Sequence, residues 1–174
     1  MKKVLAIIIG ILIIGSVGWL VISNRTTPDE SGRQAHFEKA PGFALQDYNG
    51  KTVNLADFAG KPRVINSWAA WCPFCVQELP DFVAAQKEFG DKVAIIAIDR
   101  SESLAVAKSY TDQQGITDNL IFLLDPSDSF YRSIGGFSMP ETIFVDKDGN
   151  IVFHKRGPMD INEMRQKIEK LLSL

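Results

Sequence analysis

The only two cysteines of the 174-residue chain, Cys72 and Cys75, are separated by two residues in the stretch WCPFC. Three kinds of site use cysteines at this spacing: a redox couple, a metal site and a structural disulfide. A metal site needs about four N or S ligands, and the only histidines, His36 and His154, lie far away in the sequence. A structural disulfide across so short a loop removes little chain entropy. We therefore expect no metal and no other cofactor, and favour the redox couple.

The position of the cysteines supports a redox role. Arg63–Trp68 has the pattern of a short buried strand, and Pro73–Phe89 has apolar residues at helical spacing with a proline in the first turn. Cys72 would then lie at the N-terminus of a helix, where unpaired N–H groups and the helix dipole stabilise a thiolate. We expect Cys72 to be the exposed nucleophile, and Cys75, one turn later, to be the buried thiol that resolves a mixed disulfide.

Two further residues could support this chemistry. Glu78 follows Cys75 by one helical turn, and its apolar neighbours predict partial burial, where its carboxyl group could accept or relay a proton. The alternative is an ordinary solvent-exposed glutamate. Pro140 precedes a predicted strand, where proline marks a sheet edge or a cis turn. The alternative there is an ordinary turn proline.

The first residues of the chain predict export. Lys2 and Lys3 precede an uncharged apolar run over residues 4–23, close to the ~20 residues that a membrane-spanning helix needs. This run exceeds the apolar segment of about 7–15 residues in a signal peptide, and no clean cleavage site follows it. We therefore expect an uncleaved transmembrane anchor over residues 1–23 rather than a cleaved signal. The two lysines stay in the cytoplasm, which puts the rest of the chain at the outer face of the cell membrane.

The remainder divides into a polar tether, residues 24–40, and one folded domain, residues 41–174. Without Lys2 and Lys3, the 19 Lys and Arg fall to 17 against 21 Asp and Glu, a net charge of −4. This mildly acidic balance without a basic cluster argues against nucleic acid as a partner and against adhesion to anionic lipid. We expect a monomer that contacts the membrane through residues 1–23 only.

The folded domain predicts an α/β fold, a mixed central sheet flanked by helices. Residues 43–55 alternate between apolar and polar around Asn49-Gly50, the pattern of a β-hairpin. A proline inside the cysteine helix, Pro80, should kink it. Further strands are expected at 93–98, at 120–124 and on both sides of Asp148-Gly149, and further helices at 101–114, at 126–134 and from 160 onward.

These motifs in this order resemble the membrane-anchored TlpA/ResA/CcmG-like thiol-disulfide oxidoreductases of the thioredoxin superfamily. The resemblance spans residues 40–174 and rests on APGFAL, NSWAAWCPFC, ELP, MPETIFVDKDGNIV and the closing helix. It implies a thioredoxin-like fold with an N-terminal β-hairpin and a helix–strand insertion within residues 101–124. It also implies reduction of protein disulfides in cytochrome c maturation, with apocytochrome c as substrate and a transmembrane thiol carrier as electron donor.

The resemblance also assigns roles to individual residues. It implies that Pro140 is a cis-proline beside the active site and that Met139 offers backbone hydrogen bonds to the substrate. Glu78 matches an acidic residue that tunes the thiols, and Asn66 stands where cytosolic thioredoxins have a buried aspartate. The remaining expected substrate contacts flank or separate the cysteines: Trp71, Pro73 and Phe74.

Other functions remain open on the sequence. Many relatives place proline directly before the second cysteine, whereas here Phe74 holds that position and Pro73 follows Cys72. Because this dipeptide tunes the redox potential, a disulfide-introducing oxidase is the main alternative to a reductase. A thiol peroxidase is disfavoured because Ala69 stands where such enzymes usually carry an activating threonine. A non-catalytic binding module is disfavoured because both cysteines are present.

Overall fold

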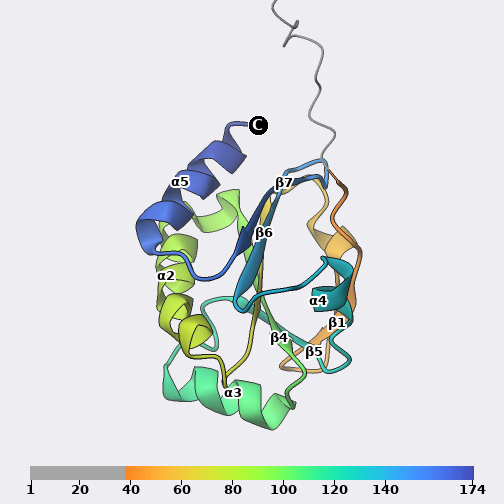
Figure 1. The fold of residues 1–174 in the computed structure, drawn as a ribbon, viewed down its shortest axis with the longest axis vertical. Coiled ribbons are helices and arrows are strands. Elements are labelled where there is room, and N and C mark those ends of the chain that lie inside the picture. Colours follow the sequence, from red (N-terminus) through yellow and green to blue (C-terminus); the bar gives the residue numbers. More distant parts are fainter. Residues whose placement is uncertain (1–37) are drawn as a thin grey trace, which may run out of the picture. The chain divides into compact units, whose positions relative to one another are not determined.

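A seven-stranded mixed sheet runs through the part of the chain that the computed structural model describes, residues 38–174 (Figure 1). In the order in which they lie side by side, the strands are β2 (Thr52–Asn54), β1 (Ala44–Asp47), β5 (Ile121–Asp125), β4 (Ala94–Arg100), β3 (Arg63–Trp68), β6 (Glu141–Val145) and β7 (Ile151–Arg156). The central strands β3, β4 and β5 are parallel. Antiparallel hairpins, β1–β2 and β6–β7, form the two edges.

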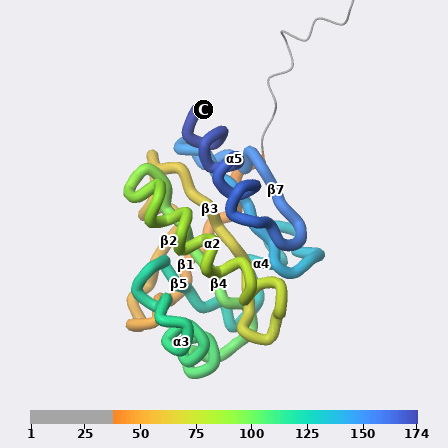
Figure 2. Tube along the Cα trace, turned by 90° about the vertical axis from the view of Figure 1, so that its left-hand side faces the viewer, coloured from red at the N-terminus to blue at the C-terminus, as the bar shows by residue number. Residues whose placement is uncertain are grey.

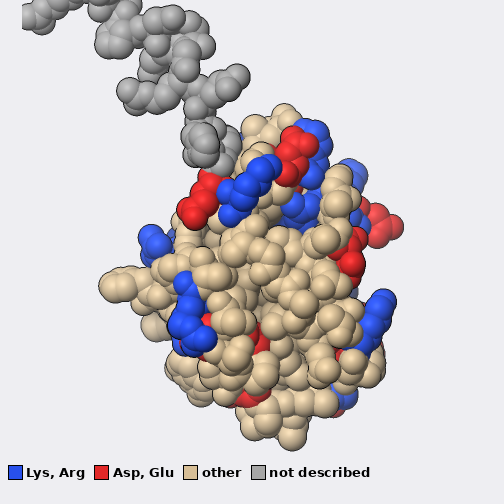
Figure 3. Space-filling view, turned by 90° about the vertical axis from the view of Figure 1, so that its right-hand side faces the viewer, with Lys and Arg blue, Asp and Glu red and all other residues tan. Residues whose placement is uncertain are grey.

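Helices cover both faces of this sheet. They are α2 (Pro73–Phe89), α3 (Leu104–Gln113), α4 (Ser129–Ser133) and α5 (Ile161–Leu172), with short 3-10 helices η2 (Leu55–Phe58) and η3 (Gly90–Lys92). Figures 1 and 2 show α2, α3 and α5 on one face and α4 on the other. The face on the side of α4 carries Lys and Arg side chains scattered among Asp and Glu, with no single basic patch (Figure 3).

Alternation along β4 explains how one strand serves both layers. Successive side chains of a strand point to opposite faces, so an apolar run can be buried on both sides. Ile95 packs in the cluster formed with α2 and α5, whereas Ile96 and Ile98 pack in the cluster formed with α4. The continuous apolar sequence of β4 is thus the signature of a central strand.

The predicted α/β fold is confirmed, and most predicted elements have the expected positions. Strand β3 and helix α2 have the predicted bounds, and α3 with β5 occupies the predicted insertion. Helix α3 begins later than predicted because the Ser103 hydroxyl caps it, accepting the N–H of Val106 at 3.4 Å. Helix α4 is shorter than predicted because Asp128, with φ of 57°, interrupts the helical backbone just before it.

Helix α2 continues through Pro80 to Phe89, and the kink that we predicted at Pro80 stays a prediction. Proline has no N–H, so it cannot bond the carbonyl of Val76, four residues earlier. The hydroxyl of Tyr110, on α3, donates to that carbonyl at 3.4 Å. A side chain from a neighbouring helix thus supplies a donor for the carbonyl that the proline leaves free.

The predicted anchor, residues 1–23, and residues 24–37 of the tether lie outside the described residues. Within residues 38–174, no helix is both long enough and apolar enough to cross a membrane.

Substitution of Phe82 tests the packing of α2 on the sheet. Its ring is fully buried, so Phe82→Ala should lower the free energy of unfolding by about 3–5 kcal/mol through the lost burial and the cavity left behind. The same change at Phe137, which is 87% exposed, should alter stability by no more than about 0.5 kcal/mol. Urea unfolding followed by circular dichroism measures both. Equal losses in the two variants would contradict the packing of α2 on the sheet.

Candidate active site

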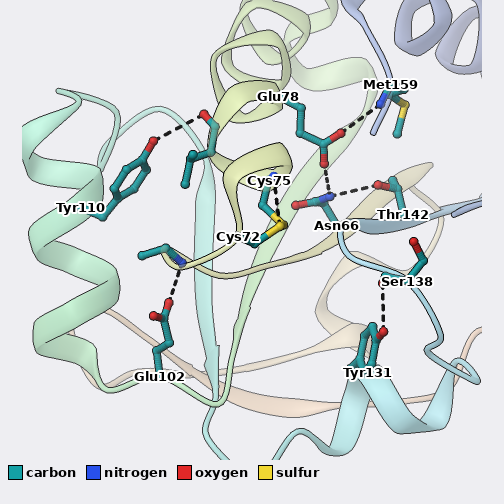
Figure 4. Close-up of a disulfide and its surroundings, with 12 residues drawn as sticks. Asn66, Cys72, Cys75, Glu78, Glu102, Tyr110, Tyr131, Ser138, Thr142 and Met159 are labelled. Atoms are coloured by element: carbon teal, nitrogen blue, oxygen red, sulfur yellow. Dashed lines mark hydrogen bonds between the residues drawn. A yellow bond between two sulfur atoms is a disulfide. The ribbon is translucent and has the colours of Figure 1, made fainter. Parts of the chain in front are cut away.

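Cys72 and Cys75 form a disulfide at the N-terminus of α2 (Figure 4). Cys72 is the N-cap residue: its sulfur accepts the N–H of Cys75 at 3.2 Å, and its carbonyl accepts the N–H of Val76 at 3.1 Å. Pro73 fills the first helical position, where a missing N–H leaves no bond unmade. Both sulfurs therefore lie at the end of the helix whose dipole stabilises a thiolate.

Our prediction that Cys72 is exposed is wrong for this disulfide form. Cys72 is 3% exposed and Cys75 is fully buried, because both pack in one cluster with the buried indole of Trp68. Beside them, Trp71 is 59% exposed and Phe74 is 56% exposed, and Pro73 is exposed as well. The accessible surface next to the disulfide is therefore largely aromatic.

Glu78 is buried on α2, one turn beyond Cys75 (Figure 4). Its Oε1 accepts a hydrogen bond from Asn66 Nδ2 at 2.9 Å, and its Oε2 accepts the backbone N–H of Met159 at 3.2 Å. Burial raises the pKa of Glu78 from 4.5 to about 8, although the two hydrogen bonds act in the opposite direction. A carboxyl group with such a pKa can take up or release a proton near neutral pH.

Asn66 connects Glu78 to the sheet. It is fully buried on β3, and its side-chain amide also donates to Thr142 Oγ1 at 3.0 Å. Thr142 lies on β6 directly opposite Asn66 in the antiparallel pairing. The carboxyl group of Glu78 is therefore held by β3 through Asn66 and by the segment between β7 and α5 through Met159.

The peptide bond between Met139 and Pro140 is cis, as the resemblance implied. Met139 packs against the cluster that contains both cysteines, so this loop lies beside the disulfide. Neither the N–H nor the carbonyl of Met139 forms a hydrogen bond with another residue in the described range 38–174. The loop thus presents free backbone groups next to the reactive sulfurs.

Our reading of the sequence missed Glu141, the first residue of β6. It is fully buried, and its Oε2 accepts the backbone N–H groups of Phe137 at 2.9 Å and Ser138 at 3.1 Å. These are the residues that lead into the cis-proline loop. The available signal was a glutamate at the start of a largely apolar strand, where a buried charge requires partners.

The other oxygen of Glu141 meets the neighbouring strand β7. Arg156 Nε donates to Oε1 at 3.1 Å, and His154 Nε2 lies 2.6 Å from the same oxygen. The side chain of His154 is 23% exposed, because it packs against the buried carboxylate.

The chemistry that this arrangement can perform is thiol–disulfide exchange. Two sulfurs form a disulfide at a helix N-terminus, a carboxyl group with a raised pKa lies one turn away, and a loop with free backbone groups flanks them. No group of three or more His, Cys, Asp or Glu within residues 38–174 is arranged to hold a metal ion. His36 lies outside the described residues.

Comparison with known proteins agrees with this geometry. The family model described as redoxin matches residues 36–172. The thioredoxin-like protein YneN of Bacillus subtilis (strain 168) is 29% identical over 172 residues, which cover 97% of this chain and 98% of YneN. The thiol-disulfide oxidoreductase ResA of Bacillus thuringiensis subsp. konkukian is 26% identical over 166 residues, covering 95% of this chain and 94% of that protein.

Solved structures show the same fold. The exposed lipoprotein thioredoxin Etrx1 of Streptococcus pneumoniae strain TIGR4 superposes with a TM-score of 0.66 at 31% identity, covering 75% of this chain and 99% of Etrx1. A thiol:disulfide interchange protein of the thioredoxin family from Chlorobium tepidum TLS superposes with a TM-score of 0.70 at 26% identity, covering 79% of this chain and 98% of that one.

Glu78 should make the stability of the disulfide form depend on pH. Because its pKa rises from 4.5 to about 8 on folding, the folded state keeps a proton that the unfolded state has released between these values. The free energy of unfolding should therefore fall as pH rises through this range, by about 1.4 kcal/mol per pH unit from this group, and level off above it. Denaturant titrations from pH 4 to pH 9 measure this slope.

Glu78→Gln should remove this contribution, since the amide does not titrate; its lost hydrogen bond lowers stability equally at every pH. Glu88→Gln, at an exposed glutamate on the same helix, is the matched control and should keep the wild-type slope. Asp99, whose pKa is raised by burial to about 9, adds a similar slope in all three proteins. An unchanged slope in Glu78→Gln would contradict the raised pKa of Glu78.

Proposed function

The chain belongs to the redoxin family and is a thiol-disulfide oxidoreductase of the thioredoxin superfamily, and from this premise we propose that it reduces disulfides of proteins outside the cytoplasm. The observation that carries the proposal is the disulfide between Cys72 and Cys75 at the N-terminus of α2, beside the loop of Met139 and the buried Glu78. The helix N-terminus stabilises the attacking thiolate, the nearby carboxyl group can take up a proton, and the free backbone groups can bind a polypeptide.

In the proposed cycle, the thiolate of Cys72 attacks a substrate disulfide and forms a mixed disulfide, and one substrate sulfur leaves and takes up a proton. The thiolate of Cys75 then attacks the Cys72 sulfur, which releases the second substrate thiol and re-forms the protein disulfide. The substrate gains two electrons and two protons, and the protein dithiol loses them. Cys72 is assigned the attack because it is the N-cap residue and is the less buried of the two cysteines.

Glu78 is proposed as the proton acceptor for Cys75. Its pKa of about 8 lies close to the ordinary thiol value of about 8.5, so the proton can pass between the groups with little change in free energy. Full burial of Cys75 keeps bulk water from this role, which leaves a side chain as the source of proton exchange. Asn66 and the backbone of Met159 keep the carboxyl group in place.

The substrate chain is proposed to lie across the aromatic surface beside the disulfide. Met139, directly before the cis Pro140, offers a free backbone N–H and carbonyl that can bond a peptide backbone, as in strand addition. Trp71 and Phe74 supply exposed rings for apolar substrate side chains, and Pro73 keeps the first helical turn rigid between the two cysteines. These contacts suit an unfolded or extended polypeptide.

The proposed division of the chain is an anchor over residues 1–23, a tether over 24–40 and the catalytic domain over 41–174. Lys2, Lys3 and the uncharged run after them support an uncleaved anchor with the domain at the outer face of the membrane. A membrane-bound thiol carrier would re-reduce the domain there. The proposed substrate class is apocytochrome c, whose C-x-x-C-H cysteines must be reduced before haem attaches.

The reduction potential tests the direction of electron flow. A reductant of protein disulfides should have a potential close to that of thioredoxin, about −270 mV, whereas an oxidase should lie near the DsbA value of about −120 mV. Equilibration of the protein with dithiothreitol buffers, followed by alkylation and mass spectrometry, gives this value. The variant with both cysteines replaced by serine is the blank. A potential near the DsbA value would make the protein a disulfide-introducing enzyme.

Trapping tests the substrate. Cys75→Ser should accumulate mixed disulfides at Cys72, because the thiol that releases the substrate is gone. Cys72→Ser is the matched control and should trap far less, since its remaining thiol is the fully buried one. Mass spectrometry of the trapped species should find c-type cytochromes linked through their haem-binding cysteines. If the trapped proteins included no c-type cytochrome, apocytochrome c would be refuted as the substrate class, while the proposed reductase activity would stand.

A further inference from the structure

A carboxylate outside the cysteine helix holds the loop that leads to the disulfide. Glu102 lies just before α3, and its Oε2 accepts the backbone N–H of Ala70 at 2.6 Å (Figure 4). Ala70 is next to Trp71 and close in sequence to Cys72. In Figure 4, Glu102 and Glu78 lie on opposite sides of the disulfide. Glu102 has no role in the proposed cycle of Cys72 and Cys75.

Asp99, at the end of β4, forms a pair with Glu102. It is fully buried, and its carboxyl group faces both the side chain and the backbone of Glu102. Burial and the facing carboxyl group of Glu102 raise the pKa of Asp99 to about 9, so Asp99 is protonated at neutral pH. Its O–H can then donate to Glu102, which in turn accepts from Ala70. Tyr48, whose hydroxyl is also buried, is the other titratable group that faces this pair.

Arg100, the last residue of β4, contacts α4, the helix that leads into the other loop of the site. Its guanidinium donates to both carboxylate oxygens of Asp128, at 2.8 and 2.5 Å, and lies 3.7 Å from the centre of the Tyr131 ring. The Tyr131 hydroxyl donates to the carbonyl of Ser138 at 2.9 Å (Figure 4). Ser138 directly precedes the cis Met139–Pro140 peptide.

The backbone turns at Ser101, so that the side chains of Arg100 and Glu102 on either side of it point toward different loops. Its φ of 61° lies in the left-handed region, which is uncommon for a residue other than glycine. The N–H of Ser101 donates to the carbonyl of Asp125 at 3.0 Å, which holds the turn against β5. Such a conformation persists where surrounding contacts impose it, and it is most frequent at functional sites.

We propose that residues 99–102, together with Tyr131 on which Arg100 packs, form a positioning bridge that sets the spacing between the loop before Cys72 and the loop before Pro140. Glu102 and Tyr131 are its two ends: one holds the Ala70 amide and the other holds the Ser138 carbonyl. The inference rests on the proposed function in one respect, namely that both loops bind the substrate. Sulfur exchange requires an aligned approach, so releasing either end misplaces the substrate relative to Cys72.

Hydrogen exchange in the full chain tests the bridge without using activity. Glu102→Ala should raise amide exchange about tenfold in its own loop, residues 69–72, because it removes a charge-assisted hydrogen bond. If residues 99–102 couple the loops, it should also raise exchange in residues 136–139. Tyr131→Phe, which keeps its ring, should show the same two-loop response with a smaller size. Responses confined to the loop that each variant touches would overturn the bridge.

Kinetics supply the second measurement. For exchange with a disulfide-bonded peptide, Glu102→Ala and Tyr131→Phe should each lower kcat/KM. The kcat/KM of the double variant should be about that of the more damaged single variant, because breaking either hydrogen bond is enough to disturb the spacing between the loops. If the fold-losses in kcat/KM of the two single variants multiplied in the double variant, the two loops would be positioned independently of each other. Glu102→Gln should recover most of the activity, since it keeps an acceptor for Ala70 and adds a donor toward Asp99.

Two control variants remove similar groups elsewhere. Tyr110→Phe removes a hydroxyl that bonds a carbonyl within α2, and Glu88→Gln removes an exposed carboxylate; neither should loosen the two loops. If Glu102→Ala did not fold, the response of residues 69–72 to Tyr131→Phe would decide alone. A chain that shows the two-loop response but no reductase activity would refute the proposed function and keep the bridge. A chain that has reductase activity, but in which each variant affects only the loop it touches, would refute the bridge and keep the proposed function.

Discussion

The constraint on which the site depends is the abrupt passage from β3 into α2. Strand β3 ends at Trp68 inside the sheet, and α2 begins at Pro73, so the chain has only a few residues in which to turn. Cys72 must therefore cap the helix, and Cys75 must lie on its first turn, facing the same cluster as Trp68. The proximity of the sulfurs, the favourable helix dipole and the burial of Cys75 all follow from this connection.

The sheet brings the other parts of the site to the same edge. Parallel strands β3 and β4 end together, with Trp68 opposite Asp99, and the antiparallel β6 begins beside the end of β3, with Glu141 opposite Ser67. The cysteine loop, the turn after β4 and the cis-proline loop are consequently neighbours, although they are far apart in sequence. This is the edge at which α/β folds generally place their ligands.

Loops that meet in this way lack regular backbone partners, and here carboxyl groups supply them. Glu78 accepts the N–H of Met159, Glu102 accepts that of Ala70, and Glu141 accepts those of Phe137 and Ser138. Carboxyl oxygens accept these amide N–H groups, and the bonds are stronger where the carboxyl group is ionised, so a few side chains can hold three segments around the disulfide. The same burial that makes the bonds strong raises the pKa of Glu78 and of Asp99. Structural support and proton chemistry thus have one physical origin.

The order of the strands and helices and the position of the cysteines at a strand-to-helix junction were predictable from local patterns: apolar periodicity, Asn49-Gly50 in the hairpin and a proline in the first turn of α2. The cis form of Pro140 was implied only by the family resemblance. Burial of Glu78 was foreseen from its apolar neighbours on the same helix, and the resemblance pointed to its role. The packing of distant segments had to be seen to learn that Cys72 is covered in the disulfide form, that His154 packs on Glu141, and that Glu102 holds Ala70. The physical reason is that a polar side chain shows its partner only when distant segments pack together, and no local pattern in the sequence encodes which buried donor a carboxylate will meet.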